Sequence, residues 1–264
     1  MPTTERRRLT TLSRSITGDV AIITGAGSGM GRSTAHLFAD EGAQVAVVDW
    51  NGDAAASVAE EITAAGGKAR AWTVDVSDPL GVEVMVDEVV EHFGSLRIVV
   101  NNAGVAVLAA ISDGNYLDAW QQNDAVNLRG QVNVIRAALP YLREAAHPRI
   151  VNIASTEGLG ATALNSPYAA SKHGVIGLTR ALAVELGREG ITVNCVCPGP
   201  IRTGMTAAIP EEDKTKFARR RVPLRRYGQP EEVAHATLAL VLPSASYITG
   251  VALPVDGGLR VQNT

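Results

Sequence analysis

Two residues able to move a proton, Tyr168 and Lys172, lie four positions apart in this sequence. On a helix that spacing places both side chains on one face, one turn apart. A free phenol titrates near pH ~10, so it acts as an acid or base near neutrality only if its pKa is lowered. The positive charge of a neighbouring lysine lowers it, because that charge favours the ionised phenol. A tyrosine followed by such a lysine is common on helices, so the pair needs support from the rest of the sequence.

A glycine-rich turn near the N-terminus offers a place for a phosphate-bearing cofactor. It runs from Thr24 to Gly31, directly after an apolar strand-like segment and directly before a segment with helical spacing. Glycines let bare backbone approach a pyrophosphate, and a helix N-terminus adds free N–H groups and partial positive charge. The placement between strand and helix makes the signal stronger than the glycines alone. The residues expected to contact the cofactor here are Gly25, Gly27, Ser28, Gly29, Met30 and Gly31.

An acidic residue, Asp49, ends the second apolar run, about twenty residues beyond the glycine turn. A carboxylate at this place accepts hydrogen bonds from the adenosine ribose hydroxyls and repels a 2′-phosphate. The sequence therefore predicts NAD as the cofactor, with NADP less favoured. Arg32, in the first turn of the expected helix, is the only nearby residue that argues for NADP, and it can equally face solvent.

Short β-branched segments alternate with helical segments from Val20 onward, which predicts a parallel sheet covered by helices on both faces. Right-handed crossovers make a doubly wound, Rossmann-type α/β fold the simplest topology. No linker divides the chain, so we expect one catalytic domain over residues 18–264, after a basic, mobile arm over residues 1–17. The predicted strands are Val20–Thr24, Gln44–Asp49, Ala69–Val74, Leu96–Asn101, Arg149–Ala154, Ile191–Cys197 and Val251–Val255. The predicted helices include Ser33–Glu41, Ala54–Ala65, Gly81–Phe93 and most of Asn115–Ala146, despite Pro140.

Composition argues against several classes of function. The net charge is −3 and no cluster of Lys or Arg lies beside aromatic residues, so nucleic acid is not an expected partner. The apolar runs are too short to span a membrane, and no apolar stretch follows the basic N-terminus as in a signal peptide. We therefore expect a cytoplasmic protein. The five histidines are scattered, and Cys195 and Cys197 alternate along a strand as buried thiols, so neither a metal site nor a disulfide is predicted.

Residues 205–226 are polar, lack a strand partner and precede a helix that starts near Pro230. Such an insertion is a candidate mobile lid over a substrate, the alternative being an ordinary surface excursion. The basic run of residues 219–221, 225 and 226 could attract an acidic substrate. Such runs are more often solvated or salt-bridged at a subunit contact, and we favour that interpretation from the sequence.

Together these motifs resemble those of the short-chain dehydrogenase/reductase family. The glycine turn is similar to that family's TGxxxGxG pattern, and further motifs follow in the family's order over roughly residues 18–258. They are Asp75-Val76, Asn101-Asn102-Ala103-Gly104, Asn127, Ser155, Tyr168-Ala169-Ala170-Ser171-Lys172, Pro198-Gly199-Pro200-Ile201-Arg202-Thr203 and Val255-Asp256-Gly257-Gly258. Each motif is modest alone, but their order and spacing make the resemblance specific.

The resemblance implies a catalytic set of four residues. Tyr168 would be the acid/base, Lys172 would favour its ionised form and bond the nicotinamide ribose, and Ser155 would polarise the substrate oxygen. Asn127 would hold a water that links the lysine to bulk solvent.

The resemblance also implies further cofactor contacts and two structural roles. Asn101 would brace the sheet and Asp256 would shape a turn, rather than take part in chemistry. Asp75 and Val76 would lie beside the adenine, and Ile201 and Thr203 at the nicotinamide carboxamide. The remaining implied cofactor contacts are Asn102, Ala103, Gly104, Tyr168, Lys172, Pro198 and Gly199.

These observations predict an NAD(H)-dependent oxidoreductase that transfers a hydride between nicotinamide and a secondary alcohol or ketone. The main alternative is an NADPH-dependent reductase of 3-oxoacyl thioesters of an acyl carrier protein, which Asp49 disfavours. A nucleotide-sensing protein without turnover is disfavoured because all four catalytic residues are present. The resemblance further implies a homotetramer, assembled through the helices around Asn115–Ala146 and Pro167–Gly187.

Overall fold

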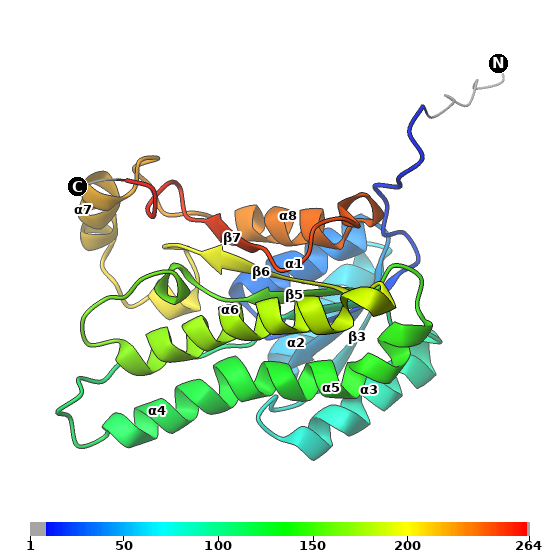
Figure 1. Ribbon diagram of the computed structural model, residues 1–264, viewed down its shortest axis with the longest axis horizontal. Helices are drawn as coiled ribbons and strands as arrows, with labels where there is room; N and C mark the ends of the chain where they lie inside the picture. The colour runs from blue at the N-terminus through cyan, green and yellow to red at the C-terminus, as the bar shows by residue number, and fades with distance from the viewer. Residues whose placement is uncertain (1–8, 263–264) are drawn as a thin grey trace.

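A seven-stranded parallel sheet with the order β3-β2-β1-β4-β5-β6-β7 forms the centre of the structure (Figure 1). The computed structural model describes residues 9–262. Successive connections run outward from β1 on one side and from β4 on the other, so the topological switch point lies between β1 and β4. The strands are β1 (Val20–Thr24), β2 (Gln44–Asp49), β3 (Lys68–Thr73), β4 (Ile98–Asn101), β5 (Arg149–Ile153), β6 (Thr192–Pro198) and β7 (Ala252–Val255).

Helices cover both faces of this sheet, as predicted. One face packs on α1 (Gly29–Asp40), α2 (Gly52–Ala64) and α8 (Pro230–Val241). The other face packs on α3 (Pro79–Phe93), α5 (Gly130–Glu144) and α6 (Ser166–Leu186). Figure 1 shows α8 on one side of β5 and β6 and α6 with α5 on the other. The doubly wound α/β fold is therefore confirmed.

Local sequence explains where these elements begin and end. All five residues of β1 are buried, which is why its sequence is uniformly apolar up to Thr24 rather than alternating. Helix α3 begins after Asp78, whose side chain accepts a hydrogen bond from the N–H of Leu80, and it has Pro79 in its first turn. It ends at Gly94, which has a φ of 84°, a conformation that glycine adopts without strain.

Most predicted strand boundaries agree with the structure to within one or two residues, but the segment Asn115–Ala146 does not form one helix. It is divided into α4 (Tyr116–Asp124), a π-helix over Ala125–Arg129, and α5. The predicted lid over residues 205–226 contains the short helix α7 (Glu211–Arg221). Apolar periodicity does not distinguish a π-turn from an α-turn, because both bury a similar stripe.

Part of the segment that the sequence predicts as an N-terminal arm contacts the rest of the chain. Residues 1–8 of the expected arm lie outside the described residues, but the end of the arm packs on the domain. Ile16 is 1% exposed, and the carbonyl of Ser13 accepts a hydrogen bond from the N–H of Ser244 at 2.9 Å. The sequence does not reveal this contact, because a single buried isoleucine among basic residues produces no apolar periodicity. Over residues 9–262, no helix is both long and apolar enough to cross a membrane.

Candidate active site

The carboxyl ends of β1, β4, β5 and β6 meet at one edge of the sheet, and most of the predicted site residues follow these ends. Thr24 ends β1, Asn102 follows β4, Ser155 lies two residues after β5, and Pro198 ends β6. Side chains far apart in the sequence are adjacent here because parallel strands share their direction. This edge carries both the glycine turn and the Tyr168 helix.

Side-chain to backbone hydrogen bonds join the glycine turn to the segment after β4. The Asn102 side-chain Nδ2 donates to the carbonyls of Thr24 (2.9 Å) and Gly25 (3.1 Å). The Thr24 hydroxyl accepts from the N–H groups of Asn102 and Ala103, both at 3.0 Å. A Cβ on Gly31 would lie 2.1 Å from the Gly25 carbonyl oxygen, so no side chain fits at this position.

The turn has the features needed to hold a dinucleotide. Helices α2 and α3 have side-chain caps from Asn51 and Asp78, whereas no side chain caps the first turn of α1 after Ser28. The partial positive charge at the start of α1, and the N–H groups of its first turn that no side chain caps, are therefore available to an anion. Within residues 9–262, the buried Oδ1 of Asn102 also has no hydrogen-bond partner. The residues present thus fit a bound pyrophosphate-containing cofactor.

Asp49 lies at the end of β2 with its carboxylate held toward the glycine turn. Its Oδ2 accepts from the N–H of Gly27 and its Oδ1 from the N–H of Asn51, each at 2.9 Å. The side chain of Arg32 instead makes a forked ion pair with Glu61, at 3.0 Å from Nε and 2.9 Å from Nη2. Arg32, the cation that the sequence places in the first turn of α1, is therefore paired with Glu61.

The other expected cofactor residues surround this turn. Asp75 is exposed and its carboxylate accepts from the N–H of Ser77, whereas Val76 is buried. Thr203 lies against the start of α1, because a Cβ on Gly29 would be 3.4 Å from it. Pro198, Gly199 and Ile201 form the end of β6 and the loop that follows it.

Tyr168 and Lys172 lie on α6, one turn apart, with the Lys172 Nζ 5.6 Å from the centroid of the Tyr168 ring. Lys172 is 3% exposed, and its ammonium donates to the carbonyl of Ile153 at 2.9 Å. Burial lowers the pKa of Lys172 to about 8. Burial raises the pKa of Tyr168, an effect that Glu157 reinforces and the neighbouring Ser155 hydroxyl opposes.

The pKa of Tyr168 is raised in the structure, whereas the sequence led us to expect that it is lowered. The Lys172 ammonium donates its hydrogen bond to the carbonyl of Ile153, and its charge does not offset the desolvation of the phenol. Desolvation disfavours the charged form of a phenol, so the site on its own holds Tyr168 as a neutral acid. A positive charge brought close to the phenol is needed to reverse this.

Asn127 is fully buried in the π-helix and binds a loop at the site through its carboxamide. Its Oδ1 accepts from the N–H of Val105 at 2.8 Å, and its Nδ2 donates to the Val105 carbonyl at 2.9 Å and to the Ser171 hydroxyl at 3.1 Å. A Cβ on Gly104 would lie 3.1 Å from the Asn127 Oδ1 and 3.6 Å from the Lys172 Nζ. Gly104 therefore leaves the space between Asn127 and Lys172 open. π-Turns of this kind are frequent at functional sites.

Sequence reasoning gave no role to two residues that shape the site. Ser171 links Asn127 to α6, because its hydroxyl also donates to the carbonyl of Tyr168 at 2.8 Å. Thr24 joins β1 to the segment after β4 as described above. Both lay within motifs that carried the resemblance, but only contacts reveal what their hydroxyls bond.

Two predicted structural residues stand apart from the reacting groups. The Asn101 side chain donates to Asn152 at 2.9 Å inside the sheet, as a bracing role requires. The Asp256 carboxylate accepts from the N–H groups of Gly258 and Arg260, both at 2.9 Å. In the described part of the chain, no three His, Cys, Asp or Glu residues are grouped as metal ligands. Cys195 and Cys197 are free and buried, as predicted.

Known proteins share this arrangement along nearly the whole chain. A family model described as enoyl-(acyl carrier protein) reductase matches residues 25–260. The chain is 40% identical over 239 residues to the (2S)-[(R)-hydroxy(phenyl)methyl]succinyl-CoA dehydrogenase subunit BbsD of Thauera aromatica, covering 90% of this chain and 95% of that protein. It is 41% identical over 239 residues to meso-2,3-butanediol dehydrogenase of Serratia marcescens, covering 90% and 93% of the two chains.

A solved structure agrees with the sequence comparisons. It is a short-chain type dehydrogenase/reductase from Mycobacterium marinum, with a TM-score of 0.88 and 35% identity, covering 94% of this chain and 98% of that one. Fold, ordered motifs and relatives lead to one conclusion: this chain is an oxidoreductase and belongs to the short-chain dehydrogenase/reductase family.

Proposed function

We propose that the chain is an NAD(H)-dependent oxidoreductase that transfers a hydride between nicotinamide and a secondary alcohol or ketone, with Tyr168 as the acid/base. The observation that supports this best is that Ser155, Tyr168 and Lys172 lie together beside the glycine turn, with the Ser155 hydroxyl acting on the Tyr168 pKa. The names of relatives are in keeping with it, since they include meso-2,3-butanediol dehydrogenase and cyclohexanol dehydrogenase.

In the oxidative direction, Tyr168 as phenolate accepts the proton of the substrate hydroxyl, and in reduction the neutral phenol returns it. Ser155 donates a hydrogen bond to the substrate oxygen and so fixes it beside Tyr168. The Lys172 ammonium, which donates to the Ile153 carbonyl at 2.9 Å, would favour the phenolate on moving closer to the phenol. Bound NAD⁺ supplies the hydride acceptor. The Asn127 carboxamide fixes Val105 and keeps open the path to Lys172 through which a proton can be exchanged with solvent.

The preference for NAD over NADP is supported by two features of the charged groups. The Asp49 carboxylate is directed at the glycine turn by the Gly27 and Asn51 N–H groups, where it would repel a 2′-phosphate. Arg32, the one cation nearby, is occupied by Glu61. Both features act at the adenosine end, so they do not depend on the substrate.

The test is cofactor titration and turnover with three proteins. We expect the wild type to bind NADH more tightly than NADPH, and Asp49→Ala to reduce that preference. We expect Tyr168→Phe to bind NADH normally but to lose about 10²–10⁴-fold in kcat for a panel of secondary alcohols and ketones. Full turnover in Tyr168→Phe would refute the assignment of the acid/base.

The second candidate is an NADPH-dependent reductase of 3-oxoacyl thioesters. Relatives named 3-oxoacyl-[acyl-carrier-protein] reductase, at 38% identity in Thermotoga maritima and 36% in Chlamydia trachomatis, favour it. Initial rates with NADPH and NADH separate the two candidates. A clear preference of the wild type for NADPH would overturn the argument from Asp49 and place this reductase first.

We also propose a homotetramer assembled through α4, α5 and α6. Large apolar side chains on two of these helices are exposed in the single chain, notably Leu117 (72%), Trp120 (43%) and Val184 (84%). Contiguous patches of exposed apolar side chains often mark contacts between proteins. The expected partners are therefore copies of the same chain and a small alcohol or ketone.

A further inference from the structure

The segment from Met205 to Arg226 is strongly basic in a chain with a net charge of −3. It holds seven Lys or Arg against three Asp or Glu, and no acidic residue occurs between Asp213 and Glu231. The rest of the molecule is correspondingly acidic. A local field of opposite sign attracts anionic ligands to this part of the surface.

Ion pairs neutralise only part of this charge. Glu211 binds both Arg202 and Lys214, at 2.8 and 3.0 Å, and Glu232 binds Arg226 at 2.6 Å. Over residues 9–262, no ion pair reaches the five remaining cations of the segment, which are Lys216, Arg219, Arg220, Arg221 and Arg225. Cations in the last turn of α7 offset its dipole. That accounts for the last-turn arginines but not for Lys216 in the middle of the helix or Arg225 beyond its end.

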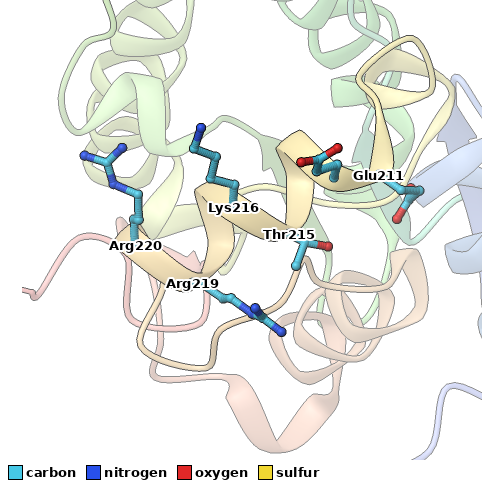
Figure 2. Close-up of a pocket in the computed structure, with 6 residues that line it drawn as sticks. Glu211, Thr215, Lys216, Arg219 and Arg220 are labelled. Atoms are coloured by element: carbon cyan, nitrogen blue, oxygen red, sulfur yellow. The ribbon is translucent and has the colours of Figure 1, made fainter.

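Three of these cations line an open groove along the exposed side of α7 (Figure 2). The groove has a volume of about 610 Å³. Figure 2 shows Lys216 and Arg220 directed to one side of the helix and Arg219 to the other. Its lining residues are Glu211, Glu212, Thr215, Lys216, Arg219 and Arg220, all from α7, so no other element covers this face.

Both ends of α7 are fixed to the edge of the sheet that carries the reacting groups. Arg202, next to Thr203, pairs with the start of the helix at Glu211. Beyond its end, the N–H of Leu224 donates to the carbonyl of Gly257, which follows β7, at 3.2 Å. The cations are thus held on the rim of the candidate active site.

One layer of chain separates the buried side of α7 from the loop after Ser155. Leu259 packs against Ala218 and Val222 of α7, and the neighbouring Arg260 donates to the carbonyl of Leu159. Packed layers of chain are about 8–10 Å apart. A ligand that touches Tyr168 and the outer cations together must therefore carry its anionic groups on a long arm.

We propose that Lys216, Arg219 and Arg220 bind the phosphate groups of coenzyme A, so that the alcohol or ketone reaches Tyr168 as the acyl group of a coenzyme A thioester. Guanidinium groups match phosphate oxygens in pairs, and the three cations are free of ion pairs within the described residues. Six side chains of one short helix are too small a surface for a stable complex with a carrier protein, which buries about 800 Å² on each partner. The inference rests on the proposed function, because it names the substrate class of that site.

The first test measures binding without turnover. Free coenzyme A is titrated calorimetrically into the NADH-loaded wild type, into Lys216→Ala/Arg219→Ala/Arg220→Ala, and into the control Lys68→Ala/Arg188→Ala, which removes two exposed cations elsewhere. We expect the triple variant to raise Kd by about tenfold or more and the control to leave it unchanged. Dephospho-coenzyme A should bind the wild type more weakly, and added salt should weaken wild-type binding. Equal binding to all three proteins overturns the proposal.

The second test separates this proposal from the proposed function. A 3-hydroxyacyl-coenzyme A and an uncharged secondary alcohol are oxidised by the same three proteins. We expect the triple variant to raise KM for the thioester with kcat unchanged, and to leave the uncharged alcohol unaffected. Oxidation of the alcohol without coenzyme A binding overturns the α7 site and keeps the proposed function. Coenzyme A binding without oxidation of either substrate overturns the proposed function and keeps the site. A change of oligomeric mass in the triple variant, or binding of acyl carrier protein but not coenzyme A, overturns the α7 site.

Discussion

Tyr168 lies between two neighbours with opposite effects on its pKa. The Ser155 hydroxyl lowers that pKa, whereas the negative charge of Glu157, two residues further on, raises it. Glu157 is held in place by Thr162, whose N–H and hydroxyl donate to it at 2.8 and 2.7 Å. The loop after β5 therefore supplies both the hydroxyl proposed to orient the substrate and a charge that raises the pKa of the proposed acid/base.

Glu157→Gln should shift the pH dependence of alcohol oxidation. Oxidation needs the phenolate, so kcat/KM rises with pH through the pKa of Tyr168. Removing the negative charge of Glu157 lowers that pKa, so the rising limb of the profile should move to lower pH. Ala163→Ser, a change at an exposed position of the same loop that alters no charge, should leave the pH profile unchanged. If the rising limb of the kcat/KM profile is unchanged or moves to higher pH in Glu157→Gln, this role of Glu157 is contradicted.

Gly31→Ala should disrupt the cofactor turn. The new Cβ would lie 2.1 Å from the Gly25 carbonyl oxygen and 2.4 Å from the Asn102 Nδ2. Because both neighbours are hydrogen-bonded within the turn, we expect the unfolding free energy to fall by about 3 kcal/mol. We also expect NADH to bind more weakly. Gly187→Ala is the matched control, because it meets nothing within 4 Å and has a φ of −58°. It should be neutral or stabilise by up to about 1 kcal/mol in urea unfolding.

At the scale of elements, the π-helix and α8 show how the positions of side chains are set. The π-turn at Ala125–Arg129 places Asn127 where its carboxamide reaches Val105 and Ser171. Helix α8 begins with a capping box, in which Glu232 accepts from the N–H of Gln229 at 2.7 Å. Arg226 reinforces this cap with two bonds to Glu232, at 2.7 and 2.6 Å.

Glu232→Gln should weaken this cap in a pH-dependent manner. The Arg226 guanidinium and the Gln229 N–H lower the pKa of Glu232 to about 2. Its stabilising effect is therefore complete above the ordinary pKa of a glutamate, which is 4.5, and is lost as the pH falls toward about 2. The side chain is 43% exposed, so solvent screening limits the effect at pH 7 to about 1 kcal/mol or less.

Urea unfolding at pH 7 and pH 3 measures this difference. The difference in unfolding free energy between the wild type and Glu232→Gln should be smaller at pH 3 than at pH 7. Glu231→Gln serves as the control. Among the described residues Glu231 pairs only with His235, at 3.7 Å, and it takes no part in the cap. A difference in unfolding free energy that does not change with pH would show that the charge of Glu232 does not stabilise the cap.

At the scale of the whole molecule, a buried charged cluster ties together the end of the sheet opposite the site. Asp19, just before β1, pairs with Arg97, just before β4. Arg97 also donates to the carbonyl of Val241 at the end of α8, at 3.1 Å. The neighbouring Arg149 is 1% exposed and, in the described residues, its Nε and Nη2 have no partner. Two buried guanidinium groups thus depend on one carboxylate.

Asp19→Asn should therefore destabilise the whole domain. It would leave two buried positive charges without a counter-charge, and breaking a buried pair in this way costs about 3–5 kcal/mol. Glu189→Gln removes one partner of the exposed pair with Arg143 and should cost no more than about 1 kcal/mol. Urea unfolding of the two variants measures the comparison. Equal losses of unfolding free energy in the two variants would show that the Asp19–Arg97 pair stabilises the domain no more than a surface pair does.

The proposed tetramer predicts the mass of the particle in solution. Light scattering after size-exclusion chromatography should give four times the 27.6 kDa mass of the chain. Val184→Glu, on the exposed face of α6, should reduce this mass, because a charge at an apolar contact is costly to bury. Val84→Glu, at a 58% exposed position on α3, should not. A monomeric wild type would remove the proposal.

The sequence by itself determined the fold, the family and the catalytic candidates. Uniformly apolar runs such as Val20–Thr24 mark strands that are buried on both faces, and the glycine turn marks where the first helix must begin. Right-handed crossovers then make a doubly wound fold the simplest topology. These signals are local and depend on periods of two and 3.6 residues, so they can be read without contacts.

Only the tertiary structure decided how the candidate residues are held and what surrounds them. The π-turn at Asn127, the bond from Lys172 to the Ile153 carbonyl and the ion pair of Arg32 with Glu61 all join residues far apart in sequence or break a local period. The same holds for the basic run of α7, where pairing on the folded surface separates Arg226 from the unpaired Arg219 and Arg220. Charge and hydrogen-bond partners depend on distance in space, which spacing along a chain does not fix.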